Sequence, residues 1–362
     1  MALVIDPWGA ELHADYEKIV KQFGLEVFDS SLFPHPNRMM RRNVVFASRD
    51  QKLIASCIKN KKPFYALTGI MPSGDKLHFG NKMVVEQMIY FQEHGAKTYI
   101  LVADLEAATT RGVSLEEARR RAMEFHIPAY IALGLDPKKT TFYFQSENKD
   151  VMHLAYEAAK HITLNEFRAV YGAADPARIM AAVTQVGDIL FPQLEEPMPG
   201  IIPVGIDQDP HIRLTRDVVA RTKSAHNFFP PAAVYHKFTP SLTGELKMSK
   251  SRPSGNIDLP EDTEEVAKKI QKAVTGGRKT LEEHRKLGAE VEKDMVFELL
   301  KIHLIENDNK LDQIYQQYKS GEMLSSELKK IAVEKMTAFM DEFTKELEQA
   351  RKHVDKLKFI RF

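Results

Sequence analysis

The sequence has little cysteine, no excess of charge of either sign and no long apolar run. Its 362 residues contain one cysteine, Cys57, which excludes an internal disulfide and disfavours a closed zinc site built on several thiolates. The 51 basic and 50 acidic residues leave a net charge of +1, so a polyanionic partner would have to use local patches. No run reaches the ~18 apolar residues that span a bilayer, and the first residues lack the pattern of a secretory signal. We therefore expect a cytoplasmic protein without a membrane partner.

The composition fits a globular protein with a sizeable core, since 43% of the residues are hydrophobic and 28% are charged. Residues 1–60 are interpreted as an N-terminal appendage with helices near 15–22 and 49–60. In residues 61–255, apolar β runs alternate with helices. The expected strands are 63–68, 98–103, 141–144 and 201–206. This alternation predicts an α/β fold of Rossmann type, with a doubly wound parallel sheet that binds ligands at the carboxyl ends of its strands.

The last part of the chain, residues 256–362, has a wholly helical pattern. Helices are expected over 262–274, 292–306 and 309–319. A longer helix is expected over 325–354, with an apolar stripe that is most simply explained by core packing. This part therefore predicts a separate all-helical domain at the C-terminus.

A first motif, residues 71–81 (MPSGDKLHFGN), follows the first predicted strand. Pro72 and the next two residues predict a turn, and a helix should begin near His78 or Gly80. A helix N-terminus offers backbone N–H groups and partial positive charge to a phosphate, while His78 adds a hydrogen-bond donor. Gly80 has no side chain, so a nucleotide can approach the backbone. A lone histidine is more often structural, but the turn and the glycine favour an ATP-binding role.

A second motif, KMSKS at residues 247–251, lies in a segment rich in serine, glycine and proline. Such a composition is typical of a loop rather than a regular element. Lys247 and Lys250 are spaced to stabilise the charge that develops on a pyrophosphate leaving group. The alternative is an ordinary basic surface loop.

The two motifs resemble the HIGH and KMSKS signatures of class I aminoacyl-tRNA synthetases, which activate an amino acid with ATP and transfer it to tRNA. Asn81 replaces the second histidine of the first signature, and its amide can still donate a hydrogen bond. The resemblance implies that ATP binds with Mg²⁺ and that His78, Lys247 and Lys250 are catalytic. The residues themselves indicate no dedicated metal site. The implied ATP-binding residues are Pro72, His78, Gly80, Asn81, Gly205, Asp207, Lys247, Met248, Ser249 and Lys250.

Several segments are more specifically similar to tryptophanyl-tRNA synthetases of the archaeal and eukaryotic branch. They are IDPW at 5–8, VGIDQDPH at 204–211, RLTRD at 213–217, TGGR at 275–278 and EEHR at 282–285. The resemblance implies formation of tryptophanyl-adenylate from tryptophan and ATP, followed by transfer to tRNA(Trp). It also implies a homodimer, with a dimer-interface insertion in residues 61–255 and an anticodon-binding domain in residues 256–362.

The same resemblance implies a tryptophan-binding site. Glu106 follows the second predicted strand, where a glutamate of the eukaryotic enzymes holds the substrate ammonium; Gln185 is implied to assist. Asp188 matches the aspartate that accepts the indole N–H in the bacterial branch, and it lies three residues from Gln185 on one helical face. Gln208 is implied to contact the amino acid. The tyrosine and glutamine that surround the indole in eukaryotic enzymes are replaced here by leucines, Leu67 and Leu101.

Alternatives to tryptophan–tRNA ligase remain at this point. A tyrosine–tRNA ligase would share the fold, but the resemblance implies that its archaeal members carry at the position of Leu67 a tyrosine that reaches the substrate hydroxyl. Leucine removes that partner and opens volume for a bicyclic ring. A non-catalytic RNA-binding protein would not need two ATP-binding motifs. An adenylating enzyme with another acceptor would not need the helical domain.

Overall fold

The computed structural model describes residues 16–172, 174–248 and 252–360, which fall into two compact units. The first unit comprises the described residues of 1–75, 84–237 and 349–362, and the second those of 76–83 and 238–348. The domain boundaries expected from the sequence remain predictions. Among the described residues, no helix is both long enough and apolar enough to cross a membrane.

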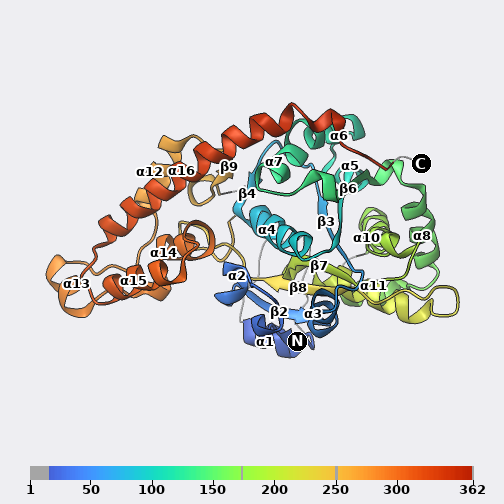
Figure 1. The fold of residues 1–362 in the computed structure, drawn as a ribbon, viewed down its shortest axis with the longest axis horizontal. Coiled ribbons are helices and arrows are strands. Elements are labelled where there is room, and N and C mark those ends of the chain that lie inside the picture. The colour runs from blue at the N-terminus through green and yellow to red at the C-terminus, as the bar shows by residue number, and fades with distance from the viewer. Residues whose placement is uncertain (1–15, 173, 249–251, 361–362) are drawn as a thin grey trace. The chain divides into compact units, whose positions relative to one another are not determined.

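A seven-stranded sheet forms the centre of the first unit, in the order β1-β2-β8-β7-β3-β5-β6 (Figure 1). Its strands are β1 (Glu26–Val27), β2 (Val45–Arg49), β3 (Tyr65–Ile70), β5 (Lys97–Val102), β6 (Thr140–Phe144), β7 (Gly200–Gly205) and β8 (Ala232–His236). The five strands from β8 to β6 are parallel, whereas β2 pairs antiparallel with β8 and with β1. The mostly parallel α/β sheet predicted from the sequence is therefore confirmed.

Helices connect the parallel strands, as the alternating pattern predicts. They are α4 (Phe79–Glu93), α5 (Asp104–Arg111), α6 (Leu115–Arg121), α7 (Ile127–Ala132), α8 (Lys149–Ala159), α9 (Leu164–Tyr171), α10 (Pro176–Leu190) and α11 (Asp209–Arg221). Capping residues start several of them: Ser114 accepts a hydrogen bond from the N–H of Glu117, and Asn148 accepts one from that of Val151. The predicted helix start near His78 or Gly80 is confirmed, because α4 begins at Phe79.

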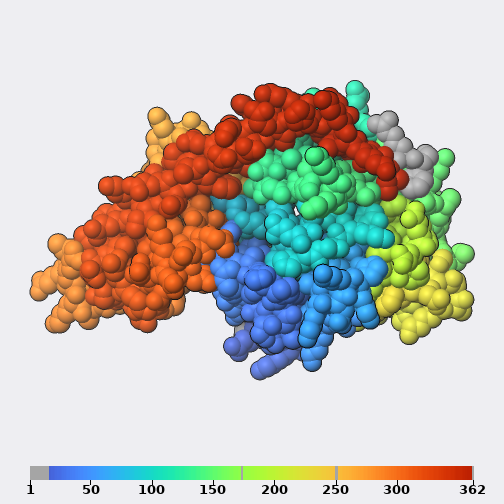
Figure 2. Space-filling model, in the orientation of Figure 1, coloured from blue at the N-terminus to red at the C-terminus, as the bar shows by residue number. Residues whose placement is uncertain are grey.

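The segment before β3 contributes more to the sheet than the sequence suggested. It contains the expected helices, α1 (Tyr16–Gln22) and α3 (Gln51–Lys59), together with the short helix α2 (Arg38–Arg41) and the unexpected strands β1 and β2. Glu86 of α4 forms an ion pair with Arg38, and Tyr90 donates a hydrogen bond to the carbonyl of Pro34 at 2.7 Å. In Figure 2 the blue surface of this segment packs against the cyan surface of α4. β2 and β8 were missed because both are short and lack clear alternation.

One face of the central strand β3 packs against α10. The hydroxyl of Tyr65, a fully buried side chain, donates to the carbonyl of Ile189 at 2.7 Å. Gly200 of the neighbouring strand makes room for this ring, because a Cβ there would lie 1.9 Å from Tyr65 Cζ. The C-terminal residues extend the sheet at its β6 edge, where the N–H of Ile360 donates to the carbonyl of Phe142 at 2.9 Å.

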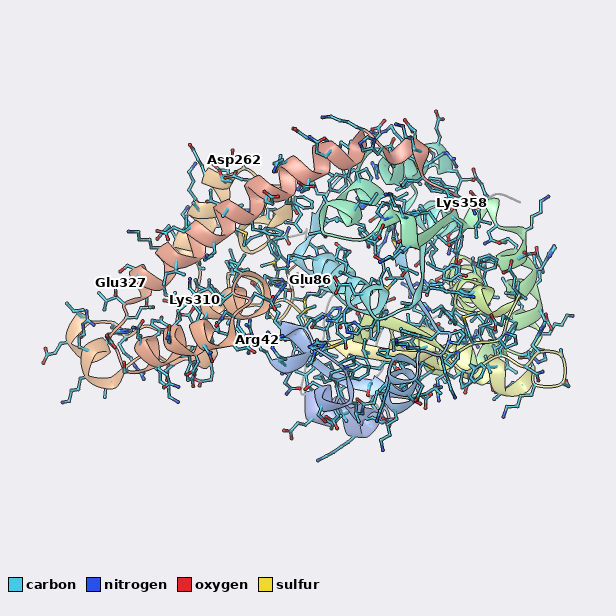
Figure 3. All side chains as sticks on the ribbon, viewed as in Figure 1. Arg42, Glu86, Asp262, Lys310, Glu327 and Lys358 are labelled. Atoms are coloured by element: carbon cyan, nitrogen blue, oxygen red, sulfur yellow. The ribbon has the colours of Figure 1, made fainter. Side chains whose placement is uncertain are left out.

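The second unit is mainly helical, as predicted for the C-terminal part of the chain. Its main helices are α12 (Thr263–Lys272), α13 (Leu281–Leu287), α14 (Met295–Leu299), α15 (Asp308–Lys319) and α16 (Ser325–Arg351), whose last residues belong to the first unit. Asp262, labelled in Figure 3, starts α12 by accepting hydrogen bonds from the N–H groups of Glu264 and Glu265. The unit also contains a two-stranded sheet of β4 (Leu77–His78) and β9 (Asp258–Leu259).

The TGGR and EEHR segments hold the helical part of this unit together. The buried carboxylate of Asp294 accepts from the N–H of Gly276 at 2.8 Å and from the hydroxyl of Tyr318 at 2.7 Å. A Cβ at position 276 would lie 2.1 Å from the carbonyl oxygen of Glu290, so the close approach requires glycine. His284 hydrogen-bonds to the carbonyl of Met323 at 2.8 Å. These motif residues therefore have evident packing roles.

Candidate active site

Polar side chains gather in the first unit at the carboxyl ends of the parallel strands. The chain reverses its strand order between β3 and β7, which is where open α/β sheets bind their ligands. The turn after β3 is fastened by the buried ring of His126, whose Nε2 lies 2.7 Å from the carbonyl of Gly74. Pro72, predicted to bind ATP, lies buried in this turn.

Glu106 and Gln185, both predicted to bind the substrate ammonium, are in direct contact. Glu106 lies in the first turn of α5, directly after β5, and is 4% exposed. The Nε2 of Gln185 on α10 donates to Glu106 Oε2 at 2.8 Å. An amide that donates in this way fixes the orientation of the carboxylate, which can then accept hydrogen bonds from an ammonium group.

Asp188, one helical turn after Gln185, belongs to a buried hydrogen-bonded cluster. Its side chain is 1% exposed, accepts from the hydroxyl of Tyr143 at 3.0 Å and accepts from Nε2 of Gln145 at 2.5 Å. Burial raises the pKa of Asp188 to about 7; the two hydrogen bonds act against this rise, whereas the charges of Glu106 and Asp104 add to it. Burial and the neighbouring Asp188 carboxyl raise the pKa of Tyr143, so its hydroxyl stays a donor. The Asp188 carboxyl therefore changes between its protonated and its ionised form near neutral pH.

An apolar surface adjoins this cluster on the same face of the sheet. Leu101 of β5 is in register with Tyr143 of β6 and with Gly69 of β3. Leu67 precedes Gly69 by two residues, so its side chain points to the same face. Gly69 is exposed although β3 lies in the middle of the sheet, and Leu67 and Leu101 are buried beside it. The sheet is therefore exposed at Gly69, and the side chains of Leu67 and Leu101 beside it are apolar.

The remaining predicted residues of the first unit follow β7. Gly205 is the last residue of this strand, and Asp207 and Gln208 lie in the short 3₁₀ helix Ile206–Gln208 that comes next. Asp209 begins α11 and is fully buried, where it accepts hydrogen bonds from Arg49 and Tyr235. This buried ion pair anchors the segment that carries Asp207 and Gln208.

In the second unit, His78, Gly80 and Asn81 form a compact hydrogen-bonded group at the start of α4. The N–H of Gly80 donates to Nδ1 of His78 at 3.0 Å, and the N–H of His78 donates to Oδ1 of Asn81 at 3.2 Å. Since Nδ1 accepts a hydrogen bond, the ring proton lies on Nε2, which is then the donor nitrogen. The amide nitrogen of Asn81 is likewise the part of that side chain that can donate.

Gly80 has a steric role that the sequence did not reveal. A Cβ at this position would lie 2.8 Å from Cε1 and 2.9 Å from Nδ1 of the His78 ring. Glycine is therefore needed for the histidine to fold back over the beginning of the helix. We expected Gly80 to let a nucleotide approach the backbone. In the structure, the absence of a side chain at this position makes room for the His78 ring.

Strand pairing connects the first motif to the segment that follows the second. His78 in β4 is in register with Asp258 in β9, a few residues beyond the KMSKS sequence. Lys247 Nζ lies 4.8 Å from the centre of the Phe238 ring, and the buried Met248 donates its N–H to the carbonyl of Thr239 at 2.9 Å. The predicted residues Ser249 and Lys250 lie outside the described residues.

Tyr143 and Gln145 were not predicted from the sequence as site residues. Residues 141–144 were expected to form a strand, but no function was assigned to its end. Alternation along this strand, together with its place beside β5, would have directed Tyr143 toward Leu101. Within the described ranges, no group of three or more His, Cys, Asp or Glu side chains is arranged to hold a metal ion.

Comparisons with known proteins agree with this arrangement. The family model for tRNA synthetases class I (W and Y) matches residues 59–341. The chain is 42% identical to a tryptophan–tRNA ligase of Methanocaldococcus jannaschii over 357 residues, which cover 96% of each chain. It is 40% identical to a tryptophan–tRNA ligase of Hyperthermus butylicus over 366 residues, with 97% of this chain and 96% of that protein covered.

Solved structures show the same likeness. The crystal structure of the tryptophanyl-tRNA synthetase from Aeropyrum pernix superimposes with a TM-score of 0.90 at 40% identity and covers 99% of both chains. That of the Encephalitozoon cuniculi enzyme bound to tryptophan gives a TM-score of 0.84 at 27% identity and covers 95% of this chain and 98% of that one. The chain belongs to the tryptophanyl-tRNA synthetase family of class I, in its archaeal-type branch.

Proposed function

We propose that this chain acts as a tryptophan–tRNA ligase. A carboxylate oxygen of tryptophan forms a bond to the α-phosphorus of ATP, and the bond to pyrophosphate breaks. A hydroxyl of the terminal ribose of tRNA(Trp) then attacks the carbonyl carbon of the adenylate, and AMP leaves. The observation that carries the proposal is the buried carboxyl of Asp188 on the face of the sheet where Gly69 is exposed between Leu67 and Leu101. The names of the full-length relatives support the same substrate.

In the first unit, the polar pair of Glu106 and Gln185 would bind the tryptophan ammonium. Glu106 is nearly buried, so a cation that binds to it exchanges water for a charge-assisted hydrogen bond. Asp188 would accept the indole N–H, and Leu67 and Leu101 would pack against the ring. Gln208 would contact the amino acid. Pro72, Gly205 and Asp207 would bind ATP.

In the second unit, the start of α4 would bind phosphate oxygens. His78 would donate from Nε2 and Asn81 from its side-chain amide, beside the backbone N–H groups of the helix N-terminus. Lys247 and Met248 would contact ATP together with Ser249 and Lys250. The lysines would stabilise the negative charge that builds up on the pyrophosphate in the transition state.

Magnesium, the dimer and the tRNA contacts are further parts of the proposal. Mg²⁺ would enter with ATP and be held mainly by phosphate oxygens and water, which is usual for this ion. Residues 256–362 would bind the anticodon, and a dimer would form through an insertion in residues 61–255. The protein would act in the cytoplasm.

Aminoacylation with radiolabelled tryptophan tests the whole reaction. The protein should charge a tRNA(Trp) transcript when ATP and Mg²⁺ are present, and omission of either should abolish charging. A transcript of another tRNA is the control and should remain uncharged. Formation of the adenylate without any transfer to tRNA(Trp) would contradict the ligase assignment.

A further inference from the structure

Gln145 carries a buried acceptor that the protein itself leaves unsatisfied. The side chain is 0% exposed and uses its amide nitrogen to donate to Asp188 Oδ2 at 2.5 Å. Its Oε1 is buried and has no hydrogen-bond partner among the residues that the structure describes. Buried polar atoms in native proteins are almost always hydrogen-bonded, so an orphaned acceptor next to a substrate-binding group indicates a missing donor.

The donors already present in the cluster are directed at Asp188 rather than at a ligand. The hydroxyl of Tyr143 and the amide nitrogen of Gln145 each donate to one oxygen of the Asp188 carboxyl. What remains toward a ligand is the unused acceptor capacity of the carboxyl and the amide oxygen of Gln145. Leu67 and Leu101, on the same face of the sheet, add no polar atom.

With Asp188 ionised and a donor of Tyr143 and of Gln145 bonded to it, the site offers mainly acceptors, which favours some side chains over others. Indole has one N–H donor and no acceptor, so the set satisfies it completely. A phenol hydroxyl can also donate, but its lone pairs would then face the oxygens of Gln145 and Asp188 without a donor. A ring with neither N–H nor O–H would leave both protein acceptors unpaired, which strongly disfavours binding.

We propose that Gln145 is a specificity-determining residue, whose side-chain oxygen accepts the indole N–H together with Asp188 while Tyr143 holds the Asp188 carboxyl in place. The inference rests on the proposed function, because it deepens the assignment of the tryptophan site. In this proposal, a residue at the end of β6 contributes to recognition of the indole. Leu67 on β3 and Leu101 on β5 provide apolar contacts to the ring.

The test compares tryptophan with an analogue that has sulfur in place of the indole N–H, 3-(benzothiophen-3-yl)alanine. Amino-acid-dependent ATP–pyrophosphate exchange is measured for the wild type and for Gln145→Met, which keeps a similar length without the amide. We expect kcat/KM for tryptophan to fall about tenfold, the loss of one hydrogen bond, mainly through KM. The preference for tryptophan over the analogue should shrink by the same factor, and KM for ATP should not change.

A purely structural role for Gln145 predicts a different result, in which tryptophan and the analogue lose activity by an equal factor; that result would overturn the proposal. Tyr143→Phe is the matched control, since it removes a donor to Asp188 but no acceptor for the ligand. It should change the preference less than Gln145→Met does. If Gln145→Met does not fold, Gln145→Asn, which withdraws the amide by one methylene, is measured in the same way.

Pyrophosphate exchange by the wild-type protein distinguishes a failure of the proposed function from a failure of the role of Gln145. If it shows no exchange with any amino acid, the proposed function fails. If it exchanges with tryptophan but the preference over the sulfur analogue is unchanged in Gln145→Met, only the role of Gln145 fails.

Discussion

The two units hold their candidate site residues in different ways. In the first unit, Asp188 is held by side chains of Tyr143 and Gln145, which lie more than forty positions away in the sequence. In the second, His78 is held by its own neighbours, through the N–H of Gly80 and the side chain of Asn81. Substitutions in a cluster of distant side chains can alter which amino acid is bound, whereas the local motif, in the role that we propose, would make the same phosphate contacts for any amino acid.

This contrast predicts that substitutions in the first unit change amino-acid use and that those in the second change the chemical step. The largest effect is expected for Lys250→Ala. A lysine that acts on the leaving pyrophosphate stabilises the transition state, so kcat for adenylation should fall by about 10²–10³ with little change in the affinity for tryptophan. Formation of tryptophanyl-adenylate in a single turnover, with enzyme in excess over labelled ATP, measures this. Lys279→Ala, at an exposed position of the helical unit, is the control and should leave the rate unchanged. Weaker tryptophan binding at an unchanged rate would contradict the assignment.

The next effect is expected for Asp188→Asn. Loss of the charged acceptor should lower kcat/KM for tryptophan by about 10- to 100-fold, because hydrogen bonds to charged groups contribute about 1.5–3 kcal/mol. KM for ATP should stay constant. Asp294→Asn, which changes an equally buried aspartate in the second unit, should reduce stability but leave KM for tryptophan unchanged. Equal effects of the two variants on tryptophan use would refute a role in indole binding.

The pH dependence of kcat/KM for tryptophan, measured for Asp188→Asn and Asp294→Asn, distinguishes an effect of the Asp188 charge from an effect of side-chain shape. With a pKa of about 7, the fraction of Asp188 that is ionised rises about tenfold between pH 6 and pH 8. If the ionised form accepts the indole N–H, kcat/KM for tryptophan should rise by up to that factor in the wild type. The profile of Asp188→Asn should lack this rise, while that of Asp294→Asn should retain it. A wild-type profile that falls over this range would contradict the model.

The same shift has a consequence for stability. The pKa of Asp188 in the folded protein lies above the ordinary value of 3.8, so folding favours the protonated form. The resulting contribution to the free energy of unfolding is fully present below about pH 4 and is lost as the pH rises to about 7. The Tm of the wild type should therefore fall more between pH 5 and pH 8 than the Tm of Asp188→Asn does. An equal decrease in both would argue against the raised pKa.

The smallest effect is expected for Gly80→Ala, at a position where local geometry alone is changed. The new methyl group would collide with the His78 ring and shift its Nε2, which should slow adenylation about three- to tenfold. Helix stability should not suffer, since alanine favours helix more than glycine does. In a His78→Ala background the same substitution should have no further effect on the exchange rate. An equal loss in both backgrounds would show that Gly80 acts independently of His78.

Different parts of the molecule were predictable from the sequence to different degrees. Four of the five parallel strands, the helical C-terminal part and the beginning of α4 follow from local periodicity and capping, and the structure confirms them; the fifth, β8, was not predicted. Strand β2 was not predicted, because its five residues lack clear alternation and the strand it pairs with lies far along the chain. Tyr143 and Gln145 were missed for a related reason: their role depends on contact with a helix more than forty residues away.

The contact between Gly80 and His78 could not be predicted either, although the two residues are neighbours in the sequence. Spacing placed both at a helix start, but the direction of the histidine ring depends on its rotamer. The structure adds that the ring lies so close to position 80 that a side chain there is excluded. The motif thus has a packing requirement in addition to the phosphate binding that we propose for it.

The central claim is that the site in the first unit selects tryptophan for reaction with ATP. ATP–pyrophosphate exchange by the wild-type protein, measured with tryptophan and tyrosine in parallel, tests this claim most directly. We predict exchange with tryptophan at micromolar concentrations and none above background with tyrosine at the same concentrations. Exchange that is faster with tyrosine, or absent with both, would contradict it.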